Sequence, residues 1–110
     1  MITILNKKGE VLYTVKAKTL SSVSLAGANL EDADFSCMDL ERIVLKGANL
    51  KGANFYGSDL TSADLSNADL SGADLSKTNL TGANLAWANL YGAKFTEANL
   101  SNVDYWGTKR

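Results

Sequence analysis

The residues that could carry chemistry are few and mostly of one kind. The chain of 110 residues contains no histidine and one cysteine, Cys37. A Ser-His-Asp or Cys-His nucleophile pair is therefore excluded, as are a histidine-ligated zinc and a zinc site of four cysteines. No neighbouring motif would activate the thiolate of Cys37, so we expect a small outward-facing residue without a reactive role.

The remaining candidates are carboxylates, of which Asp59, Asp64, Asp69 and Asp74 recur every five residues. Acid–base catalysis would need two of them to face one pocket. In a coil with one side for every five residues, these four would instead fall on successive sides of a convex rod. There is also no Gly-rich phosphate loop and no metal-ligand spacing. We therefore expect no catalytic residue, no cofactor and no metal, in a protein that is not an enzyme.

A five-residue period organises the chain from residue 21 onward. Leu, Phe or Tyr stands at every fifth position from 25 to 105, and a small or modest apolar residue, mostly Ala, stands two places before each. A helix would turn successive large residues by about 140° and leave no apolar stripe. A flat strand would send them to opposite faces because the period is odd. A bend is therefore needed in every repeat, and the large residues point inward as a core ladder that includes Leu25, Leu30, Phe35, Leu40, Phe55, Leu75, Phe95 and Tyr105.

Glycines mark where the bend falls. Eight of the nine lie two places after a large residue, where a type II turn requires the positive φ that glycine accepts. At corners without glycine, such as Asp32, Arg42, Lys77 and Trp87, we expect another turn type that needs no positive φ.

A weaker period of twenty residues indicates the number of sides. In a four-sided coil, residues twenty apart stack, and Phe35, Phe55 and Phe95 then share one column with Leu75 between them. We therefore expect an all-β solenoid with four sides and about four coils over residues 21–107.

The motif A(D/N)LXX, as in GADLSKTNLTGANLAWANL, resembles the pentapeptide-repeat family over roughly residues 21–107. The resemblance implies a right-handed four-sided β-helix, and the handedness rests on the resemblance alone. The family is widespread in bacteria and most of its members have no assigned role. The resemblance therefore implies a bacterial protein without naming its partner.

The N-terminal end breaks the period. Within residues 1–20, ITILN and VLYTV are predicted to be short strands joined by the loop KKGE, and we expect this β-hairpin to cap the first coil. The start of the chain lacks the pattern of a signal peptide, and no apolar run of about 18 residues could span a membrane. We expect a cytoplasmic protein.

The C-terminal end has no comparable element, since residues 108–110 form only a basic tail. Tyr105 and Trp106 either plug the last coil, or the uncapped end is where two copies meet. An outward cluster of Trp87, Tyr91 and Trp106 is the candidate interaction surface. The protein is thus expected to be a monomer or a homodimer through this end.

Charge is segregated along the chain: residues 1–20 carry four lysines and one glutamate, whereas residues 21–104 carry five basic and eleven acidic residues. In the resembling family, the members that protect gyrase are thought to present an acidic rod that imitates DNA. Such imitation needs a one-sided row of carboxylates, because duplex DNA carries about one charge per 1.7 Å of axis. Here Asp39 and Asp59 would stack directly, but asparagine occupies many equivalent positions.

The leading functional hypothesis is a non-enzymatic scaffold or protein-interaction module with an unassigned protein partner. Neither direct nucleic-acid binding nor a membrane is expected. The alternative is a DNA-mimicking binder of a type II topoisomerase such as gyrase.

Overall fold

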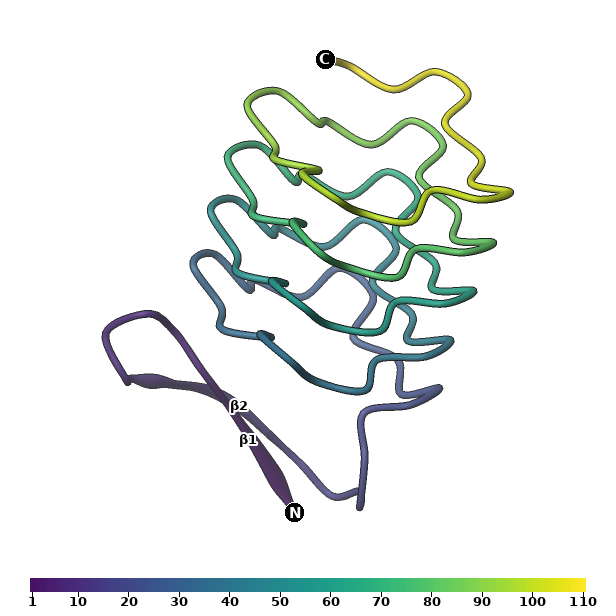
Figure 1. Ribbon diagram of the computed structural model, residues 1–110. Helices are drawn as coiled ribbons and strands as arrows, with labels where there is room; N and C mark the ends of the chain where they lie inside the picture. Colours follow the sequence, from purple (N-terminus) through teal and green to yellow (C-terminus); the bar gives the residue numbers. More distant parts are fainter.

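The computed structural model describes all 110 residues, as a β-hairpin followed by a stacked coil (Figure 1). The hairpin consists of β1 (Ile2–Leu5) and β2 (Val11–Val15), which pair antiparallel. The two strands lie where the sequence predicts them. No helix capable of crossing a membrane is present.

Parallel bridges between residues twenty apart hold the coil together, from Ser24 with Val44 to Asn89 with Lys109. Each bridge joins successive turns of the coil in both directions. Asn49, for example, donates its backbone N–H to the Ala28 carbonyl at 2.9 Å, and its own carbonyl accepts from the Leu30 N–H at 2.8 Å. One turn of the coil therefore takes twenty residues, which agrees with the spacing of the phenylalanine column.

Every corner of the coil has a positive φ, and the expectation of a different turn at corners without glycine is wrong. The non-glycine corners hold φ between 56° and 64°, including those at Asp32, Arg42, Lys77 and Trp87. At one of them the Ile43 N–H donates to the Leu40 carbonyl at 3.0 Å, as in a type II turn. The corner N–H of Arg42 also donates to the Thr61 carbonyl of the next turn at 2.9 Å. Glu97 and Asn102 keep φ 59° although their N–H groups donate to no next turn, so the turn geometry of the repeat outweighs the residue's own preference.

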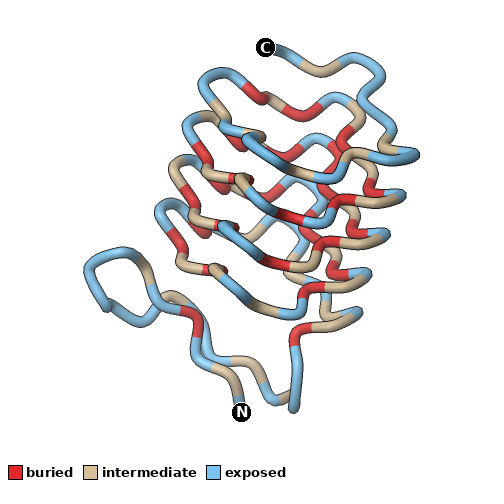
Figure 2. Tube along the Cα trace, viewed as in Figure 1, coloured by how far each residue is buried: buried red, intermediate tan, exposed pale blue.

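Buried residues recur along the turns of the coil (Figure 2), and their apolar side chains belong to one core cluster. Phe35 and Phe55 stack with ring centroids 5.0 Å apart and an interplanar angle of 11°. Tyr105 departs from the expected core ladder: it lies on the last turn of the coil and is 39% exposed. Of the other ladder residues, Leu25 and Phe95 are half-buried near the two ends, whereas the interior ones are fully buried: Leu30, Phe35, Leu40, Phe55 and Leu75.

The hairpin joins the first turn of the coil through β1 and the residues that follow it. The Asp34 N–H donates to the Leu5 carbonyl at 2.8 Å, and the Lys7 N–H donates to the Asp32 carbonyl at 3.0 Å. Ile4 of β1 is fully buried in the same core as the coil leucines. The hairpin therefore covers part of the first turn with both backbone hydrogen bonds and an apolar side chain.

Candidate functional site

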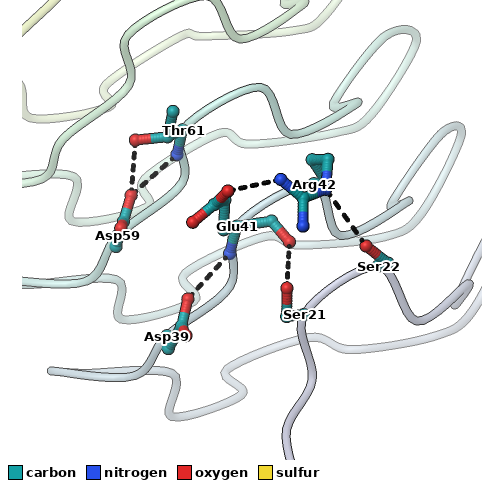
Figure 3. A network of polar contacts seen from close by, with 7 residues as sticks. All are labelled: Ser21, Ser22, Asp39, Glu41, Arg42, Asp59 and Thr61. Carbon is teal, nitrogen blue, oxygen red and sulfur yellow. Dashed lines mark hydrogen bonds and ion pairs between the residues drawn. The ribbon is translucent and has the colours of Figure 1, made fainter.

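Three carboxylates gather on one edge of the coil (Figure 3). Oxygen atoms of Asp39, Glu41 and Asp59 lie within 4.8 Å of one another. Asp39 and Asp59 are bridge partners on successive turns, as the twenty-residue spacing predicts. Sequence reasoning missed Glu41, which stands at a corner two places after Asp39. The position of an acidic residue two places after one member of the stacked pair Asp39 and Asp59 could have indicated the cluster.

Protein groups already hold all three carboxylates of this cluster. The Glu41 N–H donates to Asp39 Oδ1 at 3.2 Å, and Arg42 forms an ion pair with Glu41. Asp59 Oδ1 accepts from the Thr61 N–H at 2.9 Å and from its hydroxyl at 2.6 Å. Hard cations prefer such oxygen atoms, but these partners account for the arrangement. The cluster is therefore part of a polar network, which reaches the preceding turn where Arg42 Nε–H donates to Ser22 Oγ at 3.3 Å.

The candidate interaction surface predicted from the sequence, here called the aromatic surface, comprises Trp87, Tyr91 and Trp106. These residues are 59%, 71% and 74% exposed, respectively. The Trp87 N–H donates to the Trp106 carbonyl at 2.8 Å, so the two tryptophans lie on adjacent turns. The ring of Trp87 packs on Gly107, where an added Cβ would lie only 2.5 Å from the ring. The Trp87 ring thus packs against the Gly107 backbone on one side, while more than half of its surface is exposed to solvent.

A column of polar residues, Asp69, Asn89 and Lys109, runs along one side of the coil, and its member Asn89 stands between Trp87 and Tyr91 in the sequence. Asn89 in this column is the bridge partner of Asp69 on one turn and of Lys109 on the other. Burial alone would raise the pKa of Asp69. The hydrogen bonds from Ser71 and the charges of nearby lysines together outweigh this effect, so the pKa lies below its usual value. Asn89 therefore has an acidic and a basic residue as its bridge partners on the two neighbouring turns.

A hollow of about 410 Å³ opens at the C-terminal end of the coil and is here called the C-terminal hollow. The guanidinium carbon of Arg110 lies 5.2 Å from the centroid of the Tyr105 ring. Tyr105 forms part of the wall and Trp106 is largely exposed, so neither residue plugs the last turn. The lining consists of Leu90, Gly92, Ala93, Phe95, Leu100, Tyr105 and Arg110.

The geometry gives a convex rod whose unusual surfaces lie toward one end. A comparison with family models finds a match to the pentapeptide repeats (8 copies) over residues 24–61, 39–76 and 68–104. The chain belongs to the pentapeptide-repeat family. The recurrent inward leucines and the corners after them are thus the family's repeat.

Solved structures of the family carry the same fold. A pentapeptide repeat protein from the Arabidopsis thaliana thylakoid lumen is 43% identical, with a TM-score of 0.70 over 82% of this chain and 59% of that protein. A trypsin-treated variant of QnrB1, a plasmid-mediated fluoroquinolone resistance protein, is 31% identical, with a TM-score of 0.70 over 73% of this chain and 39% of QnrB1. These relatives are right-handed β-helices, and the all-β coil described above is of that kind. No curated protein matches the chain.

The chain spans less than two thirds of the length of both of these structures. Their similarity supports the fold of the coil over most of the chain. It does not extend to the parts of those proteins that have no counterpart here.

Proposed function

We propose that the chain is a non-enzymatic scaffold whose C-terminal end, formed by the aromatic surface and the C-terminal hollow, binds a protein partner. The observation that carries this proposal is the exposure of the three aromatic rings of Trp87, Tyr91 and Trp106 beside the C-terminal hollow. Aromatic side chains are enriched at protein interfaces, where they supply much of the binding energy. We further propose that each twenty-residue turn has four sides, because a corner follows every five residues. The rod then has about four coils, and we expect the protein in the cytoplasm.

A comparative capture experiment tests this function. The full chain and its Trp106→Ala variant are immobilised, and native-host proteins retained by each are quantified. Tyr56→Ala serves as the matched control, because Tyr56 is also an exposed aromatic residue, at 40%, but lies at a distant corner. We expect a partner that is lost with Trp106→Ala and kept with Tyr56→Ala. Equal retention by all three proteins would contradict the proposed surface.

The same end is also the proposed site of a homodimer. Two copies meeting there would bring together Lys109 and Arg110 of each, so like charges would oppose the apolar contact. We therefore expect sedimentation to show association that strengthens as salt screens these charges, and that weakens with Trp106→Ala. A monomer at every salt concentration, with or without the substitution, would remove the dimer.

The alternative is a DNA-mimicking binder of a type II topoisomerase such as gyrase, which the similarity to a fluoroquinolone resistance protein favours. The charge pattern argues against it, because acidic columns are interrupted: Asp74 lies between Asn54 and Lys94 among its bridge partners. Inhibition of gyrase supercoiling at low micromolar protein would support this alternative. Absence of inhibition would leave the interaction module as the proposed function.

A further inference from the structure

The outer edge of β2 is unpaired. β2 pairs with β1 along one side, and no bridge joins it to the coil. Outside the hairpin ladder, the one backbone hydrogen bond that involves β2 runs from the Ala17 N–H to the Val15 carbonyl, at 3.0 Å. The strand lies within the chain, at the base of the coil in Figure 1, and residues on both sides of it belong to the structure. Free donors and acceptors on such an edge form a template for a further strand.

The sequence of β2 carries few of the features that protect an edge. Charged residues, proline and bulges are the usual means by which edge strands avoid pairing. Val11–Val15 contains neither a charged residue nor a proline, and Val11 and Tyr13 are 63% and 37% exposed. A bulge is present at Leu12, an extra residue that has no counterpart on β1. From Tyr13 to Val15 the register is regular, so this half of the edge is open to a partner.

The charges that flank β2 are opposite in sign. Glu10 precedes the strand and Lys16 follows it, and both are exposed. The Glu10 carboxylate accepts from the Asn6 amide at 2.9 Å, and neither charged side chain forms an ion pair within the chain. Glu10 and Lys16 each stand three residues from Tyr13. A second copy of β2, antiparallel and centred on Tyr13, would therefore place Lys16 of each copy opposite Glu10 of the other.

The same register also matches the side chains inside the strand. Val11 would lie opposite Val15 of the second copy, and Tyr13 opposite its own counterpart. Aromatic and β-branched pairs of this kind stabilise neighbouring strands, as do pairs of opposite charge. A shift of one residue would place Glu10 opposite an uncharged residue, so the flanking charges select the centred register. Glu10 and Lys16 have long side chains that reach each other across the bend that the bulge introduces.

We propose that β2 pairs antiparallel with β2 of a second copy, which joins the two hairpins into one four-stranded sheet. The contact goes beyond the proposed function, because it uses neither the aromatic surface nor the C-terminal hollow. Both copies contribute the same surface, so the contact closes as a symmetric dimer. Salt should weaken this dimer, because it screens the attraction between Glu10 and Lys16. A dimer through the C-terminal end should respond to salt in the opposite direction.

Sedimentation of the full chain carrying Trp106→Ala tests the proposal without the C-terminal contact. A five-residue strand buries less than the standard interface of about 1,600 Å², so the series extends to about 1 mM protein, where a weak dimer is detected. We expect a dimer that dissociates as salt is raised. In a mixture of ¹³C-labelled and unlabelled chains, isotope-filtered NOEs should join Val11 of one copy to Val15 of the other. A monomer throughout, or intermolecular NOEs confined to other residues, would overturn the inference.

Charge reversal identifies the register. In the same background, Glu10→Lys and Lys16→Glu should each weaken the dimer about tenfold or more. An equimolar mixture of these two variants should associate again, because both flanking pairs are then opposite in charge. This recovery also shows that the hairpin is intact in both variants. Lys46→Glu, the same charge change at an exposed corner of the coil, should leave the dimer unchanged. No recovery in the mixture, or an equal effect of Lys46→Glu, would contradict the pairing of β2 with itself.

Discussion

At the scale of single residues, the corners hold the backbone in a conformation that L-amino acids disfavour. Ten corner residues other than glycine have φ between 56° and 64°. A left-handed conformation costs roughly 1–2 kcal/mol for such residues. The corner amide recovers part of this through the next turn, as when the Lys77 N–H donates to the Thr96 carbonyl at 2.8 Å. Glu97 and Asn102 keep φ 59° without such a bond, so the conformation of a corner follows from the repeat more than from its own side chain.

Glycine corners consequently differ in how well they accept a side chain. Gly47 has φ +68° and open space around an added Cβ, so Gly47→Ala should cost about 1 kcal/mol from the backbone alone. At Gly52 the end of the exposed Asp32 side chain occupies that space and must move aside, so we expect Gly52→Ala to cost about 0.5 kcal/mol more in urea unfolding. In an Asp32→Ala background the two substitutions should cost the same. An equal cost in the parent chain would contradict the packing of Asp32 over Gly52.

The hydrogen bonds of Ser71 to Asp69 predict a pH dependence. Ser71 donates its N–H and hydroxyl to Asp69 Oδ1 at 3.0 and 2.7 Å, and the pKa of this half-buried carboxyl is lowered although burial opposes the shift. A lowered folded-state pKa stabilises the protein above the unfolded pKa of about 4, and this is lost as the pH falls through the folded value. Ser71→Ala should raise the pKa of Asp69 in an NMR titration and cost about 1 kcal/mol at pH 7, with a smaller cost at pH 3. A cost that grows on acidification would refute this assignment.

At the scale of structural elements, the columns of stacked side chains give the coil its stability. Phe55 is fully buried and stacks on Phe35, whereas Phe95 of the same column is half-buried at the open end. Phe55→Ala should therefore cost about 3–5 kcal/mol in urea unfolding, and Phe95→Ala markedly less. Similar costs would mean that the last turn is covered in solution. Sedimentation of the parent chain would then show whether a second copy covers it.

The hairpin is the other element whose contribution can be measured. Ile4 is fully buried against the coil core, while Val11 of the neighbouring strand is 63% exposed. Ile4→Ala should cost about 2–5 kcal/mol and speed hydrogen exchange of the Asp34 amide, which donates to Leu5. Val11→Ala should cost less than 1 kcal/mol. Unchanged exchange at Asp34 in the Ile4→Ala variant would show that β1 does not depend on this contact.

At the scale of the whole molecule, the arrangement of the coil could be predicted because every five-residue repeat must place one large apolar side chain inward and then turn a corner. The inward leucines, the corner after each and the stacking of Phe35 on Phe55 follow from periods of five and twenty. The positive φ of Arg42 and Trp87 could not be predicted in this way, because neither residue type favours it and the repeat imposes it at every corner. The exposure of Tyr105 likewise depends on what covers the last turn, which the period alone does not give.

The twenty-residue bridge spacing also limits which changes of length the rod accepts. Duplicating twenty residues would add one turn and leave every later side chain on its original side. Inserting five residues between Leu45 and Leu50 would preserve the inward pattern but rotate everything after it by one corner. Phe55 would then no longer lie over Phe35, and the aromatic surface would face a different direction relative to the hairpin. The number of residues in the coil thus sets both the distance and the relative direction of the hairpin and the aromatic surface. In a relative that is longer by whole turns, the two surfaces would keep their relative direction but lie farther apart. A partner that contacts both would therefore find them correctly oriented but too widely separated.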